Sequence, residues 1–265
     1  MARTPFLDRT LPLRDGSEIP LLGFGTFQLH GDEAQHAIRW ALEVGYRQFD
    51  TATSYANEAD LGAVLAAPPV PREQMFITTK LPPGRAGREL ETLRDSLRQL
   101  RTDHVDLWLV HHPEDTELTR TWRAFIEARE AGLARSIGVS NHSVEQIDQL
   151  VRDTGVSPVV NQIRWNPFLF DRAVLDAHRA RGVAIQGYTP FRRARLDDPV
   201  LTAIAAGHSR TPAQVIVRWH AQHDVVVLPR SARPDRIRDN AAVADFELSE
   251  AEMAALDALG GSWQE

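Results

Sequence analysis

Short apolar runs recur along the chain and are separated by stretches whose apolar residues follow helical spacing. The short runs predict eight strands, at 21–27, 46–50, 75–79, 105–110, 136–139, 158–162, 183–188 and 225–228. Most of these runs are apolar at nearly every position, which is typical of parallel strands that are buried on both faces. Eight such strands alternating with helices predict an α/β fold, a closed (β/α)8 TIM barrel.

The helical stretches are bounded by recognisable start signals. They predict helices over 34–42, 59–65, 90–100, 122–126, 143–151 and 171–178, and helices that begin at Thr211, Pro234 and Ser249. Ser143 with Gln146, and Thr211 with Gln214, have the spacing of capping boxes. The helix from Ser249 is an additional C-terminal helix beyond the barrel.

The N-terminal stretch has a different pattern. Asp15-Gly16 separates two short apolar runs, which predicts a β-hairpin over 11–20 that could close the bottom of the barrel. We find no linker, charge block, low-complexity segment or internal repeat. Residues 1–265 are therefore predicted to form a single barrel domain.

Composition narrows the class of protein. The 265 residues are 43% hydrophobic and 25% charged, which is ordinary for a soluble globular protein. The chain has no cysteine, so disulfides and thiolate metal sites are excluded. We see no secretory leader and no apolar run of membrane-spanning length, and we expect a cytoplasmic protein that does not contact membranes and acts as a monomer. The net charge of -6 argues against a nucleic-acid partner but permits a local basic pocket for a small anion.

Polar residues at the carboxyl ends of barrel strands form the functional site of such folds. The residues found there, in chain order, are Asp50, Tyr55, Lys80, His111, Ser140, Asn141, Asn161, Gln162 and Tyr188. A buried Lys80 needs a counter-charge, and Asp50 is available. A lysine beside a phenol lowers the pKa of the tyrosine, so Tyr55 could serve as an acid. The alternatives are a structural Tyr55–Asp50 hydrogen bond, a structural ion pair and a core histidine.

Six segments together carry a resemblance to a known family. They are GYRQFDTATSYANE (45–58), FITTK (76–80), DLWLVHHP (106–113), GVSN (138–141), NQ (161–162) and LPRSARPDRIRDN (228–240). In this order and over nearly the whole chain, they resemble the aldo-keto reductases, particularly short-loop prokaryotic members such as the 2,5-diketo-gluconate reductases. The resemblance implies that Asp50, Tyr55, Lys80 and His111 are the catalytic tetrad.

The same resemblance implies NADP(H) as cofactor. The residues implied to contact it are Thr26, Asp50, Ser140, Asn141, Gln162, Tyr188, Arg230, Ser231, Arg236 and Asn240. Arg230, Ser231 and Arg236 would hold the 2′-phosphate, Asn240 would contact the adenine and Tyr188 would stack on the nicotinamide. Independently, the arginines at 230, 233, 236 and 238 cluster at a predicted helix N-terminus in an acidic protein, which suits a phosphate dianion. A solvated basic helix face is the alternative.

Several positions depart from the family pattern. Arginine stands at 230 where the family usually has lysine, His112 replaces a tryptophan, and Asn166 stands where many relatives have histidine. The loop after Tyr188 is short, which predicts an open pocket. We predict that Phe27, His112 and Trp165 line the substrate pocket, with a place in the core as the alternative for each. These departures prevent a substrate from being carried over.

The sequence therefore predicts an NADPH-dependent enzyme that reduces an aldehyde or ketone, a small-molecule carbonyl compound, to the alcohol. A non-catalytic nucleotide-binding sensor or structural protein of the same fold is the alternative, although no member of the tetrad is missing. A barrel hydrolase lacks support, because the strand ends offer Asp50 no second acidic partner and show no His/Asp cluster for a metal.

Overall fold

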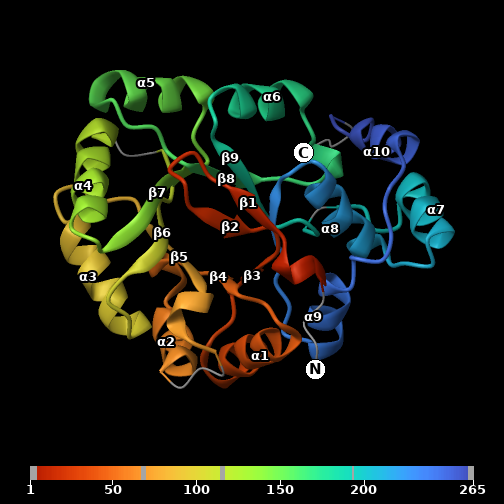
Figure 1. Cartoon of the computed structure of the whole chain (residues 1–265), viewed down its shortest axis with the longest axis horizontal. Helices are drawn as coiled ribbons and strands as arrows, with labels where there is room; N and C mark the ends of the chain where they lie inside the picture. Colours follow the sequence, from red (N-terminus) through yellow and green to blue (C-terminus); the bar gives the residue numbers. More distant parts are fainter. Residues whose placement is uncertain (1–4, 67–69, 114–116, 193, 262–265) are drawn as a thin grey trace.

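Parallel strands surround a common centre, and helices surround the strands (Figure 1). The structure is a computed structural model that describes residues 5–66, 70–113, 117–192 and 194–261. The eight barrel strands are β3 (Gly23–Gly25), β4 (Gln48–Asp50), β5 (Phe76–Leu81), β6 (Val105–Val110), β7 (Ala134–Ser140), β8 (Val160–Arg164), β9 (Ala184–Tyr188) and β10 (Val226–Leu228).

Backbone hydrogen bonds close the sheet on itself. Each strand from β3 to β10 pairs in parallel with the next one along the chain. At the seam, the Val227 N–H donates to the Leu21 carbonyl at 2.9 Å and the Gly25 N–H donates to the Pro229 carbonyl at 3.0 Å. The predicted (β/α)8 barrel is confirmed, and the carboxyl ends of its strands meet at one mouth.

The helices follow the strands as the apolar spacing predicts, with one addition. Those described are α1 (Gly31–Val44), α2 (Glu58–Leu65), α3 (Glu89–Leu100), α4 (Leu118–Glu130), α5 (Val144–Thr154), α6 (Arg172–Ala180), α7 (Pro199–Gly207), α8 (Pro212–Gln222), α9 (Pro234–Ala241) and α10 (Glu250–Asp257). The capping boxes at Ser143 and Thr211 and the C-terminal helix after Ser249 are confirmed. The addition is α7, which our sequence analysis missed. No helix among the described residues is long and apolar enough to cross a membrane.

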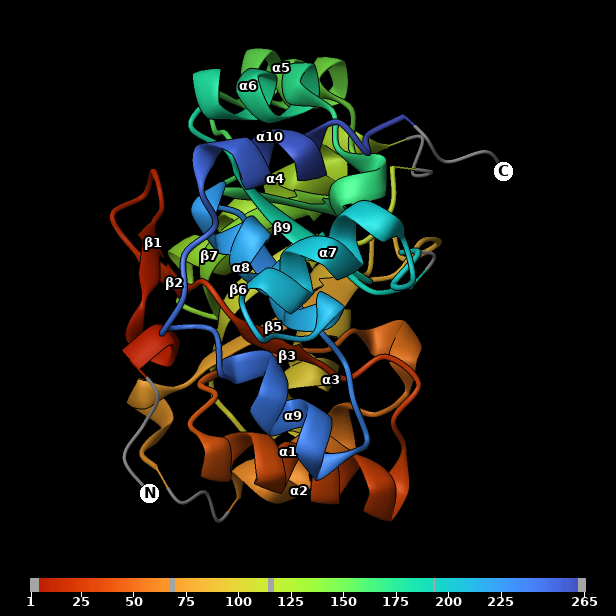
Figure 2. The ribbon, with the colours of Figure 1, turned by 90° about the vertical axis from the view of Figure 1, so that its right-hand side faces the viewer.

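The predicted hairpin is present and covers the barrel end opposite the mouth. β1 (Thr10–Pro12) and β2 (Glu18–Pro20) pair antiparallel and lie in front of the strands in Figure 1 and at the left-hand end in Figure 2. Ile19 is fully buried and packs in one apolar cluster with Leu107 and Val160 from barrel strands. This plug leaves the mouth as the accessible end of the barrel.

Candidate active site

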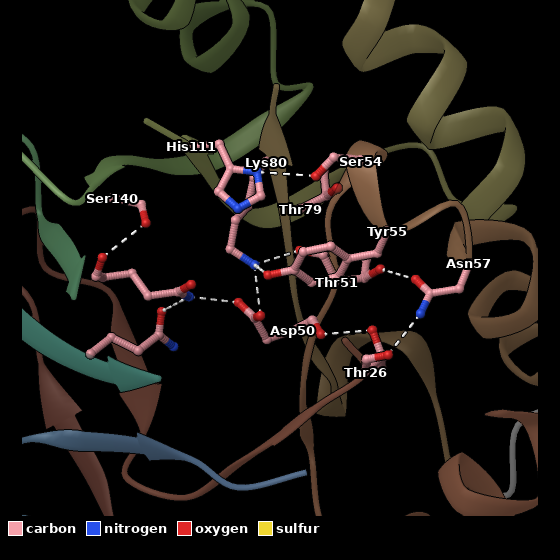
Figure 3. A network of polar contacts seen from close by, with 12 residues as sticks. Thr26, Asp50, Thr51, Ser54, Tyr55, Asn57, Thr79, Lys80, His111 and Ser140 are labelled. Atoms are coloured by element: carbon pink, nitrogen blue, oxygen red, sulfur yellow. Dashed lines mark hydrogen bonds and ion pairs between the residues drawn. The ribbon is translucent and has the colours of Figure 1, made fainter. Parts of the chain in front are cut away.

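Four side chains predicted to act together meet at the mouth (Figure 3). Asp50 ends β4, Lys80 lies on β5, and His111 directly follows β6. Tyr55 lies on a 3-10 turn, η2 (Thr53–Tyr55), in the loop between β4 and α2. Neighbouring parallel strands end at the same face, so segments that are distant in the sequence deliver these residues to one place.

Lys80 is the centre of the group. It is the only lysine in the chain and is fully buried. Its ammonium group donates to Asp50 Oδ1 at 2.6 Å and to the Thr51 carbonyl at 2.7 Å, and its Nζ lies 3.4 Å from the Tyr55 hydroxyl. These three contacts match the three donors of an ammonium group, so the lysine has no freedom to turn away from Tyr55.

Burial and neighbouring charges determine the protonation states of Lys80 and Tyr55. Burial lowers the pKa of Lys80, but the Asp50 carboxylate and Tyr55 more than offset it, so the pKa lies above its usual value and the lysine is charged. Burial raises the pKa of Tyr55 more than the Lys80 ammonium lowers it. The predicted net decrease for Tyr55 is therefore wrong, because burial outweighs the attraction of the cation. Tyr55 is a neutral phenol that carries its proton.

His111 lies against Tyr55 as a neutral imidazole. Their ring centroids are 5.7 Å apart in an edge-to-face arrangement. Burial, with smaller contributions from Lys80 and His112, lowers the pKa of His111 to about 3. The Ser54 hydroxyl lies 3.3 Å from Nδ1, and when Nδ1 accepts that hydrogen bond, Nε2 carries the proton and can donate it.

A buried framework holds Asp50 in position. The Thr26 N–H and hydroxyl each lie 3.0 Å from the Asp50 carbonyl, and the Gln162 amide donates to Asp50 Oδ2 at 2.7 Å. Asn57, which our sequence analysis did not select, donates to the Thr26 carbonyl at 2.8 Å and accepts from the Thr51 hydroxyl at 2.7 Å. Thr26 and Gln162 were predicted as cofactor contacts. In this structure Thr26 holds the Asp50 backbone and Gln162 holds its carboxylate.

A cavity of about 580 Å³ opens above the four residues. Of the predicted site residues, those on its wall are Phe27, Asp50, Tyr55, His111, His112, Ser140, Asn141, Gln162, Tyr188 and Arg230. On one side Tyr188 donates to Asn141 Oδ1 at 2.8 Å, and Asn141 donates to the Ser140 hydroxyl at 3.0 Å. These polar groups form one connected wall from β7 to β9.

Other predicted residues lie away from this wall. Trp165 is 2% exposed and packs in a core cluster with Phe168 and Trp219, so its assignment to the substrate pocket is wrong. Thr26, Ser231, Arg236 and Asn240 also do not line the cavity. Thr26 and Asn240 are buried, whereas Arg236 is exposed on α9.

The arginine cluster begins at the cavity and continues onto α9. Arg230 lines the cavity and donates to Gln28 Oε1 at 3.3 Å. The Ser231 hydroxyl accepts from the Arg233 N–H at 3.0 Å, just before α9 begins at Pro234. Arg233 pairs with Asp235 at 2.6 Å. Within this cluster, Arg230, Arg236 and Arg238 are therefore the arginines for which we find no carboxylate partner that could compete with a phosphate, as far as the described residues extend.

The wall also contains residues that our sequence analysis did not select. Arg164 ends β8, and Thr189 and Arg192 follow β9. The Thr189 hydroxyl oxygen is buried and has no hydrogen-bond partner among the described residues, and its backbone has a positive φ of 51°. A buried hydroxyl without a partner on a cavity wall fits a polar ligand. With the polar side chains of Ser140 and Asn141 at one end and the Arg230 guanidinium at the other, the wall fits a ligand such as nicotinamide adenine dinucleotide phosphate, which is polar at one end and anionic at the other.

Comparison with known proteins gives a consistent result. A sequence model of the Aldo/keto reductase family matches residues 21–260. An aldo-keto reductase of Mycobacterium tuberculosis is 43% identical, with 95% of this chain and 90% of that protein covered. The glyoxal reductase of Bacillus subtilis is 38% identical, covering 96% of this chain and 93% of that protein.

Solved structures agree on the architecture. An aldo/keto reductase from Brucella melitensis superposes with a TM-score of 0.92 at 38% identity, covering 95% of this chain and 97% of that one. An aldo-keto reductase of Bombyx mori in complex with NADP gives a TM-score of 0.92 at 31% identity, covering 100% of this chain and 95% of that one.

Proposed function

The chain belongs to the aldo/keto reductase family, and we propose that it reduces an aldehyde or ketone to the alcohol with NADPH as the hydride donor. The observation that carries the proposal is the Lys80 ammonium group between Asp50 Oδ1 at 2.6 Å and the Tyr55 hydroxyl at 3.4 Å, at the base of an open cavity. A carbonyl group needs a proton at its oxygen as hydride arrives, and the protonated Tyr55 hydroxyl lies where it can donate one.

We assign roles to the four residues from their protonation and contacts. Tyr55 donates its proton to the carbonyl oxygen, and Lys80 stabilises the phenolate that remains. Asp50 keeps Lys80 charged and oriented. His111, neutral because its pKa is about 3, donates a hydrogen bond from Nε2 that orients the carbonyl oxygen without competing for the proton.

We propose that polar and charged residues of the cavity wall bind the cofactor. Ser140, Asn141 and the amide of Gln162 would hold the nicotinamide end, and Tyr188 would stack against it. Arg230 and Arg236 would bind the 2′-phosphate, because guanidinium groups without carboxylate partners favour a dianion. When bound, the cofactor supplies the hydride.

The direct test is NADPH oxidation, followed by its absorbance, in the presence of a reactive aromatic aldehyde. The proposal expects oxidation that depends on both the protein and the aldehyde. A nucleotide-binding sensor of the same fold would bind NADPH, as fluorescence titration would show, and would oxidise none of it with any aldehyde, ketone, keto acid or keto sugar in a panel. That result would contradict our proposal and favour the nucleotide-binding sensor.

A further inference from the structure

The cavity wall is strongly basic in a protein that is acidic overall. Three arginines line it, Arg164, Arg192 and Arg230, while the formal net charge of the chain is -6. Asp50 is the only carboxylate on the described part of the wall, and the Lys80 ammonium at 2.6 Å already neutralises it. The potential inside the cavity is therefore positive and attracts anions.

The arginines of the wall have no carboxylate partner among the residues that the structure describes. Elsewhere, arginines such as Arg88, Arg172 and Arg181 pair with carboxylates at 2.6–2.7 Å. Neither Arg164 nor Arg192 has a carboxylate within ion-pair distance among the residues that the structure describes, although acidic residues outnumber basic ones, 36 to 30. Both residues are exposed and line the cavity, where they are available to a ligand.

Strand geometry places these two arginines near the reacting groups. Gln162 points into the barrel, where its amide meets Asp50, and side chains alternate along a strand, so Arg164 shares the inward face about 7 Å closer to the mouth. Arg164 pairs in register with Tyr188. Arg192 lies in the turn after Tyr188, where its N–H donates to the Thr189 carbonyl at 3.2 Å.

His112 adds a further polar group to the cavity wall. His112 lines the wall and stacks on His111 with ring centroids 4.6 Å apart. An imidazole can donate a hydrogen bond to an oxyanion. A ligand whose carbonyl group lies at Tyr55 and His111 therefore meets these donors on the wall as it extends towards the mouth.

We propose that the substrate is a carbonyl compound carrying an oxyanion, a carboxylate or a phosphate, and that Arg164 and Arg192 bind this oxyanion. The proposal rests on the carbonyl reduction proposed above and names the class of substrate for the same site. A guanidinium group offers paired N–H donors that match the paired oxygens of either anion, and the open mouth allows both arginines to reach it.

The test compares substrates that differ only in the anion. The measured quantity is the ratio of kcat/KM for para-carboxybenzaldehyde to that for para-methylbenzaldehyde, and likewise for the phosphate ester of glyceraldehyde against glyceraldehyde. We expect Arg164→Gln and Arg192→Gln each to lower at least one of these ratios about ten-fold, and the double variant to lower it further. The pair of substrates whose ratio falls identifies the oxyanion. Arg98→Gln is the control, because Arg98 lies on α3 with its side chain 71% exposed, and it should change neither ratio.

Two results would overturn the proposal. Unchanged ratios in the double variant would mean that the arginines are merely solvated. Equal losses for charged and neutral aldehydes, together with weaker NADPH binding, would assign the arginines to the diphosphate of the cofactor instead.

Failure of the proposed reduction is distinguishable from failure of the anion subsite, because it gives no NADPH oxidation with any aldehyde. In that event calorimetric titration with benzoate, against benzyl alcohol as the neutral control, still tests the subsite. Benzoate binding that is tighter than benzyl alcohol binding and is lost in the double variant supports the anion subsite. Equal binding of the two compounds overturns it.

Discussion

The two ends of the cavity are built on opposite principles. At the base, Lys80 is fully buried, its three donors have partners within 3.4 Å, and Asp50 is held from two sides. At the mouth, Arg164 and Arg192 are exposed and have no carboxylate partner among the described residues. The base is held by its own hydrogen bonds, whereas the mouth keeps its hydrogen-bonding capacity free for a ligand.

The difference follows from what each end has to do. Proton transfer requires donor and acceptor at hydrogen-bond distance, so a fixed base lowers the cost of reaching the transition state. Recognition of an anion requires charge without a competing partner, because any internal carboxylate would have to be displaced first. Substitutions at the base should therefore change the reaction rate and the stability of the protein. Substitutions of the arginines should change ligand binding.

The largest effect is expected from Tyr55→Phe, which removes the proton donor and little else. The rate of aldehyde reduction should fall about 10²–10⁴-fold, the usual contribution of a general acid. NADPH affinity and the melting temperature should change little, because the ring remains and the hydroxyl makes only the 3.4 Å contact with Lys80. Steady-state kinetics measures this, and unchanged turnover would show that another group is the acid.

Lys80→Met tests whether the base is held by the buried ion pair. The substitution leaves Asp50, whose side chain is 5% exposed, without its cation, and we expect the free energy of unfolding to fall by about 3–5 kcal/mol. Asp50→Asn in the same chain should restore much of the stability but no activity. Urea unfolding gives both values. A loss below about 1 kcal/mol would mean that water compensates Asp50.

Arg236→Ala tests whether Arg236 binds the 2′-phosphate of NADPH. Charge-assisted hydrogen bonds contribute roughly 1.5–3 kcal/mol, so NADPH should bind about ten-fold more weakly or worse, while NADH affinity stays nearly the same. Arg238→Ala removes the same charge from the same helix and is the matched control. Equal losses for both cofactors, or for both variants, would argue against a direct contact of Arg236 with the 2′-phosphate.

The last prediction is that stability depends on acid. Burial lowers the pKa of His111 to about 3 and of His142 and His220 to about 4. In the unfolded chain these imidazoles take up protons near pH 6.5, so acid favours unfolding between pH 6.5 and about 4. Each of these histidines should lower the free energy of unfolding by up to about 1.4 kcal/mol per pH unit as the pH falls through that window.

Urea unfolding at a series of pH values measures this slope. His220→Gln should reduce it by the equivalent of about one proton, since only the titration of that imidazole is removed. A slope that stays the same in His220→Gln would show that this histidine is already protonated in the folded protein.

The barrel could be predicted from the sequence because its strands are buried on both faces and give unbroken apolar runs. The four residues at the base could be predicted because strand ends converge in such a fold. The helix α7 was missed because its sequence, PVLTAIAAG, is apolar nearly all round and shows no helical period. The start of α7 could have been predicted, since Asp198 caps the helix and Pro199 is its first residue.

The errors within the site have two physical origins, the alternation of side chains along a strand and the depth of burial. Alternation along β8 from Gln162 places Arg164 on the inward face and sends Trp165 to the outer core, so strand parity would have selected the arginine. The protonation of Tyr55 depends on how deeply its ring is buried, which no sequence motif encodes.

The single lysine also makes the chain an unusual proteolytic substrate. An endoproteinase that cuts only after lysine has one bond to attack, between Lys80 and Leu81, within β5 and with both residues buried. Cleavage therefore requires the barrel to open, and it yields two fragments of defined length. The rate at which the intact band disappears in increasing urea would report the population of opened barrel, with no label added to the protein.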